Sequence, residues 1–228
     1  MKVKELEYKR ESAWYSMSDA QKNAAHEFSK GYIDFLNHAK TEREAVSVMK
    51  AEAECKGYID FQKVIDGCIS LKPGMKVYWI NRSKALLLAV IGREDPAKGC
   101  DMVGAHLDAP RLDFRPNPLY EDHDLAFAKT HYYGGIKKYQ WVSVPLAIHG
   151  VISKTDGTML NVCLGEKEDD TVYVINDLLP HLAYDQIEKK ASDVITGENL
   201  NLMIGSIPYA PENPEDAKGV KANLLKLI

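Results

Sequence analysis

The feature that most constrains this chain is an uninterrupted apolar run over residues 85–91. A polar Asn-Arg-Ser turn precedes it, and residues 76–80 before that turn have the composition of another strand. The run is too short to cross a bilayer, and it lacks the alternation of a half-exposed strand. We therefore predict two neighbouring strands, of which the second is buried on both faces of a covered sheet.

Two helices are predicted ahead of these strands. Ser18 and Asp19 can cap the first, whose apolar residues recur at helical spacing. Thr41 starts the second, because Glu44 follows three residues later in the pattern of a capping box. This second helix is expected to stop at Gly57, since glycine commonly follows the end of a helix.

A third strand is predicted over residues 101–105, and it leads directly into polar sequence. Helices followed by buried strands indicate an α/β fold in which the faces of the sheet are covered. The predicted fold class is therefore α/β.

The pattern changes after about residue 117 into shorter segments typical of a smaller β-rich part. Thr155-Asp156-Gly157 has the composition of a hairpin turn. Residues 208–214 indicate a linker, and an amphipathic helix is predicted after them. The strands predicted here cover residues 144–152, 158–164 and 171–175. We predict an organisation into residues 1–116, 117–214 and 215–228.

The composition of the chain limits the kinds of partner and the cell compartment that we expect. The net charge is −4, and lysines are interleaved with acids, so no nucleic-acid-binding surface is expected. The N-terminus lacks the apolar core of a signal peptide, and no segment is long enough to span a membrane. The four cysteines are widely spaced and are predicted to be reduced, partly buried thiols. We expect a cytoplasmic protein.

His106 and Asp108 form the sharpest chemical pattern in the chain. Residues two apart in a strand point the same way, and ligands bind at the carboxyl ends of strands in open α/β sheets. His106 could therefore bind a metal ion through one ring nitrogen while Asp108 fixes its tautomer. The same spacing also occurs in ordinary surface turns, and two residues cannot hold zinc alone. Both interpretations stay open on these residues.

Two other segments have a functional and a structural interpretation. Tyr132-Tyr133-Gly134-Gly135 is either a wall of an active site, because glycines let backbone approach a ligand, or a loop with aromatic packing. His181 follows a proline between apolar residues, which is also typical of a half-buried structural histidine.

Taken in order, several segments resemble a known family. These segments are Gly104-Ala105-His106-Leu107-Asp108-Ala109-Pro110, Tyr133-Gly134-Gly135, Ile148-His149-Gly150-Val151-Ile152 and Leu179-Pro180-His181-Leu182-Ala183. The chain is similar to the aspartyl aminopeptidase family of zinc metallopeptidases, which has comparable GSHTDSP, TYGGG, LAGRV and IPHLAIHL segments. Each motif is weak alone, and their common order carries the resemblance.

The resemblance implies an α/β catalytic domain with a two-zinc site, interrupted by an inserted β-rich domain used for oligomer contacts. It implies that His106 is a zinc ligand and that Asp108 orients the site from behind the ligands. His181 is expected to reach the active site of a neighbouring subunit in a homo-oligomer. The sequence does not distinguish zinc from other divalent ions.

The implied reaction is removal of the N-terminal residue of a peptide substrate by metal-activated water, with acidic residues suggested by the family's name. Gly134-Gly135-Ile136 departs from the family's triple glycine and resembles a divergent bacterial branch, so the substrate preference stays open.

Length is the larger departure from the family. The family's members are about twice as long, so most ligands are expected in a C-terminal half, which could be a second chain. We expect the isolated chain to be inactive. The alternative is a non-catalytic, oligomerising or regulatory fragment of the same family.

Overall fold

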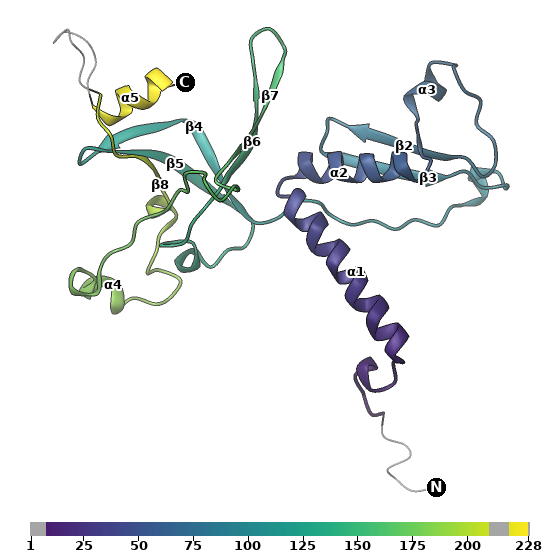
Figure 1. Cartoon of the computed structure of the whole chain (residues 1–228), viewed down its shortest axis with the longest axis horizontal. Helices are drawn as coiled ribbons and strands as arrows, with labels where there is room; N and C mark the ends of the chain where they lie inside the picture. The colour runs from purple at the N-terminus through teal and green to yellow at the C-terminus, as the bar shows by residue number, and fades with distance from the viewer. Residues whose placement is uncertain (1–7, 210–218, 228) are drawn as a thin grey trace, which may run out of the picture. The chain divides into compact units, whose positions relative to one another are not determined.

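The computed structural model describes residues 8–209 and 219–227 (Figure 1). The chain divides into two compact units, a first unit of residues 1–107 and a second unit of residues 108–228. The predicted boundary after residue 116 falls inside a strand of the second unit, Arg111–Asp122. The assignment of residues 1–116, 117–214 and 215–228 to catalytic and inserted parts stays a prediction.

Both predicted N-terminal helices are present and begin at the predicted caps. Helix α1 spans Asp19–His38, and the side chains of Ser18 and Gln21 each accept a hydrogen bond from the other residue's backbone. Helix α2 spans Glu42–Cys55, with the same reciprocal bonds between Thr41 and Glu44. It ends just before Gly57, as predicted, and a short 3-10 helix, Ala13–Tyr15, precedes α1.

The first unit contains one small sheet of three strands in the order β1-β2-β3. The strand β1, Ile59–Asp60, pairs in parallel with β2, Lys76–Asn81, and β2 pairs antiparallel with β3, Ala85–Val90. Helix α2 packs on β2 and β3, and its apolar side buries Ala45, Val46 and Ala53. The short helix α3 spans Gln62–Ile65, and a 3-10 turn spans Pro96–Lys98.

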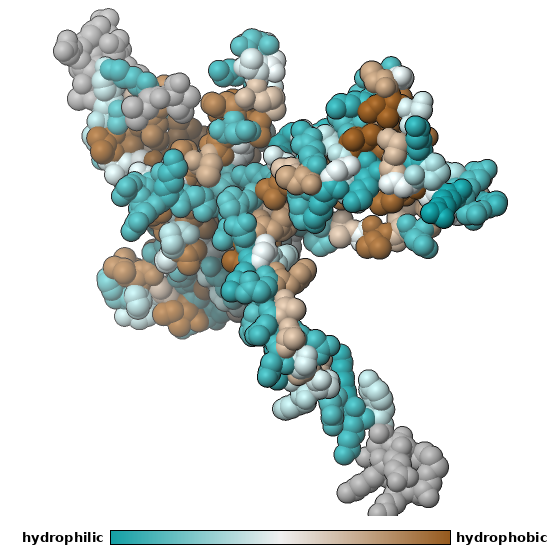
Figure 2. All heavy atoms as spheres, turned by 45° about the vertical axis from the view of Figure 1, so that its right-hand side comes forward, coloured by the Kyte–Doolittle hydropathy of each residue, from teal (hydrophilic) through white to brown (hydrophobic). Residues whose placement is uncertain are grey.

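The structure corrects two predictions about this sheet. Strand β3 exists, but it is not buried on both faces, because it lies at the edge of the sheet and exposes Leu87, Leu88 and Val90. Residues 101–105 form no strand, since no described strand pairs with them, and Val103 is fully exposed. Figure 2 shows apolar side chains on the visible surface of the molecule.

The cysteine prediction also needs correction. All four cysteines lie in the described residues and none is in a disulfide, but all are exposed rather than partly buried. They are Cys55, Cys68, Cys100 and Cys163.

A three-stranded antiparallel sheet in the order β4-β5-β8 forms the frame of the second unit. Its strands are β4, Arg111–Asp122; β5, Leu125–Tyr133; and β8, Leu202–Gly205. The sequence prediction missed β4 and β5. His123 and Asp124 join them in a two-residue turn with φ of 49° and 57°, which the pairing of antiparallel strands favours.

A separate hairpin joins β6, Ile148–Ser153, to β7, Met159–Leu164. The predicted turn at residues 155–157 is confirmed, because Asp156 Oδ1 accepts a hydrogen bond from the backbone of Thr158. Strand β6 begins four residues later than predicted, at 148 rather than 144. The strand predicted at residues 171–175 is reduced to isolated bridges at Tyr173 and Val174.

The core of the second unit is formed by strands β5 and β8 together with the segments between β7 and β8. The buried residues are Ala128, Ile175, Ile195, Leu200 and Leu202. Thr130 is buried beside them, and its hydroxyl donates a hydrogen bond to the Leu200 carbonyl. The second unit also contains short helices: Lys138–Gln140, Pro180–Leu182 and Gly197–Asn199 are 3-10 turns, and α4 spans Tyr184–Ile187.

Helix α5, Val220–Leu227, contacts all three strands of this sheet. Val220 is buried, and Glu121 at the end of β4 accepts a hydrogen bond of 2.7 Å from the Lys221 backbone. The predicted linker 208–214 and helix 215–228 lie partly outside the described residues. None of the helices that the structure describes is long and apolar enough to cross a membrane.

Gly219→Ala is expected to destabilise the second unit. The residue has φ of +106°, and an added Cβ would lie 2.6 Å from Glu121 Oε1, which is tied to the helix backbone through the other carboxylate oxygen. We expect a loss of about 1 to 3 kcal/mol in the free energy of unfolding, measured by denaturant titration. Gly157→Ala is the control, because its φ is +84° and nothing lies within 4 Å. An equal loss in both variants would show that Glu121 contributes nothing.

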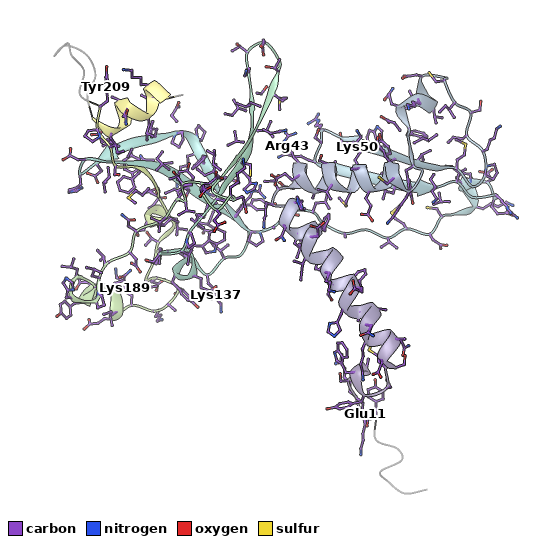
Figure 3. All side chains as sticks on the ribbon, in the orientation of Figure 1. Glu11, Arg43, Lys50, Lys137, Lys189 and Tyr209 are labelled. Atoms are coloured by element: carbon purple, nitrogen blue, oxygen red, sulfur yellow. The ribbon has the colours of Figure 1, made fainter. Side chains whose placement is uncertain are left out.

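Tyr78 gives the first unit a specific pH dependence. Burial raises its pKa to about 12, and the hydrogen bond of 2.7 Å from its hydroxyl to Glu54 Oε1 adds to this effect. The same bond is the main reason that the pKa of Glu54 is lowered, with Lys50, labelled in Figure 3, contributing from 3.6 Å.

The fold therefore favours the neutral phenol of Tyr78. The unfolded chain loses this proton near pH 10 and the folded chain only near pH 12, so stability falls as pH rises between these values. The loss is about 2 to 3 kcal/mol. In Tyr78→Phe the free energy of unfolding should change less across this window, whereas Tyr15→Phe, at an exposed position, should retain the original slope. Equal slopes in all three proteins would contradict the assignment.

Candidate functional site

His106 lies in an irregular, exposed segment between β3 and β4. It does not stand at the end of a strand, because residues 101–105 have no pairing partner among the described strands. His106 is the penultimate residue of the first unit, and Asp108 is the first residue of the second. The predicted position of His106 at the carboxyl end of a buried strand is therefore wrong, while the roles of His106 and Asp108 stay predictions.

Asp108 is half-buried, and its carboxylate has a partner on the second unit's sheet. The Tyr133 hydroxyl donates a hydrogen bond of 3.0 Å to Asp108 Oδ2. Tyr133 is the last residue of β5 and pairs directly with Arg111, the first residue of β4. The strand register therefore places the tyrosine next to the segment that leaves the His-x-Asp motif.

Arg111 contacts the same tyrosine from its ring face. The guanidinium carbon lies 4.2 Å from the ring centroid of Tyr133, which is the distance of a cation–π contact. Arg111 Nε also donates to Asp113 Oδ1 at 2.8 Å. These contacts link four side chains in series, which we call the Asp108 network: Asp108, Tyr133, Arg111 and Asp113.

The glycine turn after Tyr133 lies against the proline of the first motif. Gly134 has φ of +78°, and a Cβ built there would lie 3.5 to 3.6 Å from atoms of Pro110. Within the second unit, the glycine turn and Pro110 at the end of the first motif are therefore in contact. This contact was not predictable, because nothing in the sequence fixes the strand register that brings the two segments together.

His181 lies in the 3-10 turn Pro180–Leu182 and is exposed. The half-buried structural histidine that was the alternative prediction is therefore not what the structure shows. Three leucines close to it in the sequence, Leu178, Leu179 and Leu182, are also exposed. No hydrogen bond joins His181 to Asp108 in the described part of the chain. Its role at a neighbouring active site stays a prediction.

A histidine–carboxylate pair that the sequence did not predict lies near the β6–β7 hairpin. His149 on β6 is largely buried, and its Nε2 is 2.9 Å from Glu166 Oε1 on the loop after β7. Asp170 organises that loop by accepting backbone hydrogen bonds from Lys167 and Gly165, which lower the pKa of Asp170. Only the hairpin register brings His149 and Glu166 together, so spacing along the chain gave no signal for the pair.

The donor chemistry of His106 and Asp108 fits zinc, which takes imidazole nitrogen and carboxylate oxygen. Two side chains are too few to form a zinc site. Within residues 8–209 and 219–227, no group of three or more His, Cys, Asp or Glu side chains is arranged to hold a metal ion. Any zinc centre therefore needs ligands from outside these residues.

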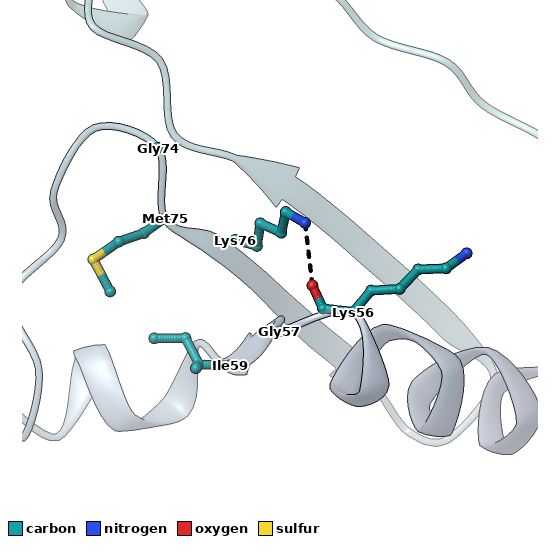
Figure 4. A pocket seen from close by; sticks show the side chains of 6 residues that line it. All are labelled: Lys56, Gly57, Ile59, Gly74, Met75 and Lys76. Atoms are coloured by element: carbon teal, nitrogen blue, oxygen red, sulfur yellow. Dashed lines mark hydrogen bonds between the residues drawn. The ribbon is translucent and has the colours of Figure 1, made fainter.

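A pocket of about 320 Å³ in the first unit contains none of the predicted site residues. Lys76 Nζ donates a hydrogen bond of 3.1 Å to the Lys56 carbonyl at its rim (Figure 4). The lining has neither a histidine nor a carboxylate, so it is not a metal site. The lining residues are Lys56, Gly57, Ile59, Gly74, Met75 and Lys76.

Residues 35–228 match the model of a family described as aminopeptidase I zinc metalloprotease (M18). The chain belongs to the M18 family. The probable M18 family aminopeptidase 1 of Clostridium acetobutylicum is 49% identical over 222 residues, which are 97% of this chain and 47% of that protein. The predicted resemblance to this family of zinc metallopeptidases is thereby confirmed.

Solved structures of M18 members agree with this assignment. The M18 aminopeptidase of Thermotoga maritima has a TM-score of 0.84 at 42% identity, covering 97% of this chain and 46% of that one. Aminopeptidase I of Clostridium acetobutylicum has a TM-score of 0.83 at 44% identity, covering 96% and 48%. The predicted mixed α/β character is confirmed. The chain spans about half the length of the relatives it matches.

Proposed function

We propose that this chain is the N-terminal part of a zinc metalloaminopeptidase that removes N-terminal residues, acidic ones included, from peptides. The observation that carries the proposal is the 49% identity to a probable M18 aminopeptidase over 97% of the chain. The match extends through both units, so it includes the His-x-Asp motif, the glycine turn and the segment around His181.

In this proposal His106 supplies one zinc ligand and Asp108 orients the site. A zinc site in an enzyme takes about three protein ligands, and a two-zinc site needs more carboxylates and histidines than the described residues bring together. The remaining ligands come from a C-terminal part that corresponds to the portion of the relatives not spanned by this chain. His181 acts at the site of a neighbouring subunit, and residues 117–214 make the contacts between subunits.

Exposed apolar side chains on the first unit support this division of the protein. Strand β3 presents Leu88 and Val90, and helix α1 has no buried residue although Phe28 and Tyr32 lie along it. An unpaired strand edge and an uncovered apolar helix are typical of surfaces that another part of the protein covers. We propose that the C-terminal part covers them.

The test is to follow the coding sequence past residue 228 and purify the extended protein. It should bind about two zinc ions per subunit by metal analysis and hydrolyse aminoacyl substrates, and a chelator should abolish this activity. His106→Ala should lower zinc occupancy and reduce kcat/KM by more than about 100-fold, because a ligand is lost. His181→Ala should reduce kcat with zinc occupancy unchanged.

His38→Ala is the matched control, because this ring lies exposed in the last turn of helix α1. It should retain both zinc and activity. A set of acidic and neutral aminoacyl substrates measures the preference. An extended protein that is a stable, metal-free and inactive oligomer would contradict the proposal and favour the non-catalytic fragment.

The isolated 228-residue chain is expected to self-associate, because its exposed apolar surface is uncovered. Light scattering should detect concentration-dependent mass. Val90→Lys, which places a charge on the edge strand, should reduce the association, while Ala97→Lys in the exposed 3-10 turn Pro96–Lys98 should not. A monodisperse monomer at all concentrations would be the contrary result.

A further inference from the structure

We propose that Tyr133 is a positioning residue for the Asp108 carboxylate and that Arg111 holds Tyr133 in place for this purpose. The inference rests on the proposed function, because Asp108 follows the proposed zinc ligand by two residues. It deepens that function by giving specific roles to Tyr133 and Arg111 in the Asp108 network, whereas the sequence pattern placed Tyr133 only in a possible active-site wall.

The hydrogen bond between Tyr133 and Asp108 orients the carboxylate. An ionised carboxylate only accepts hydrogen bonds, and a phenol is a donor with a rigid ring behind it. The contact of 3.0 Å to Oδ2 therefore fixes the rotation of the carboxyl group about its last bond. With Oδ2 directed to the phenol, the direction of Oδ1 is also set. A carboxylate that orients a metal ligand needs this restraint, since a misdirected ligand weakens the site.

The contact between Arg111 and Tyr133 holds the tyrosine ring in place. The guanidinium covers the ring at 4.2 Å, and its Nε is held by Asp113 at 2.8 Å. Guanidinium is planar and always charged, so it can stack on the ring and bond to a carboxylate at the same time. Lysine could not make both contacts in this geometry. Asp113 thus fixes Arg111, Arg111 fixes the ring, and the ring hydroxyl fixes Asp108.

The backbone on either side of Tyr133 also fixes its position. Before it, the antiparallel ladder pairs residue 133 with residue 111. After it, Gly134 turns with positive φ and rests against Pro110. The tyrosine is therefore held by the same segment that carries Asp108, and the geometry does not depend on a long flexible loop.

Tyr132 provides a matched control within the same strand. Adjacent residues of a strand point to opposite faces, and the Tyr132 ring lies near Lys138 and Gly197 instead. Removing the hydroxyl of Tyr132 leaves the Asp108 network intact. Removing the hydroxyl of Tyr133 leaves the ring and its contact with Arg111 but deletes the hydrogen bond from this residue to Asp108.

The first experiment measures zinc affinity of the extended protein by competition with a chromophoric chelator, using zinc alone as the probe. Tyr133→Phe should weaken zinc binding about tenfold, whereas Tyr132→Phe should not change it. Arg111→Lys should have a smaller effect in the same direction. Adding Tyr133→Phe to Asp108→Ala should cause no further loss, because the tyrosine acts through the aspartate.

The second experiment uses the 228-residue chain and needs no metal. Unfolding equilibria of Tyr133→Phe, Asp108→Ala and the double variant give the coupling between the two side chains. We expect a coupling of about threefold or more in the unfolding equilibrium constant. An absence of coupling overturns the positioning role, even where the single variants are destabilised.

The outcomes separate the two proposals. If the unsubstituted extended protein binds no zinc, the proposed function fails, and the coupling alone then decides whether Tyr133 positions Asp108. If that protein binds zinc and Tyr133→Phe binds it equally well, the proposed function stands and the positioning role is wrong. Equal weakening by Tyr132→Phe would also overturn it, because the effect would then be a general consequence of changing the strand.

Discussion

The antiparallel pairing of β4 with β5 is the constraint on which the second unit depends. The two-residue turn at His123 and Asp124 sets the register at one end of the ladder. The irregularity between Phe114 and Leu119 then shifts the register, so that Arg111 lies opposite Tyr133 at the other end. Strand β8 and helix α5 then add to the same sheet. A shift of one residue would turn Tyr133 to the opposite face and separate it from Asp108. The geometry of the candidate site therefore depends on the hairpin turn and on the irregularity in β4, neither of which belongs to the site itself.

Local interactions in the first unit were predictable because their signals lie within four residues of each other. The capping boxes at Ser18 and Thr41 are complete in the sequence, and both form as predicted. Burial was not predictable in the same way. The apolar composition of β3 indicates a strand that needs cover on both sides, but only its pairing with β2 and its packing with α2 are within the described residues. The apolar composition of a strand indicates that its side chains need to be covered. The exposed side chain of Val90 shows where the described residues do not provide this cover.

Strand β4 escaped prediction for a different physical reason. Pro116, Asn117 and Pro118 interrupt its alternation, and prolines are typical of turns rather than strand interiors. The structure accommodates them as an irregularity, because the register shifts between Phe114 and Leu119 and Asn117 has a positive φ. Of the candidate site, His106 and Asp108 could be named from their motif. The Tyr133–Asp108 hydrogen bond could not, since it depends on a register that the bulge itself alters.

In the proposed function, different parts of the protein supply the metal ligands and the orientation of the carboxylate behind them. Metal ligands can be contributed by separate parts of a protein, because each bond to the ion is strong and directional. Orientation of a carboxylate behind a ligand relies on weaker contacts, which hold only if the surrounding backbone is already fixed. The Asp108 network has this property, since both of its strands belong to one unit with its own core. A carboxylate fixed before the ion arrives loses less conformational freedom on binding. The chain would thus contribute preorganisation to the site more than it contributes ligands.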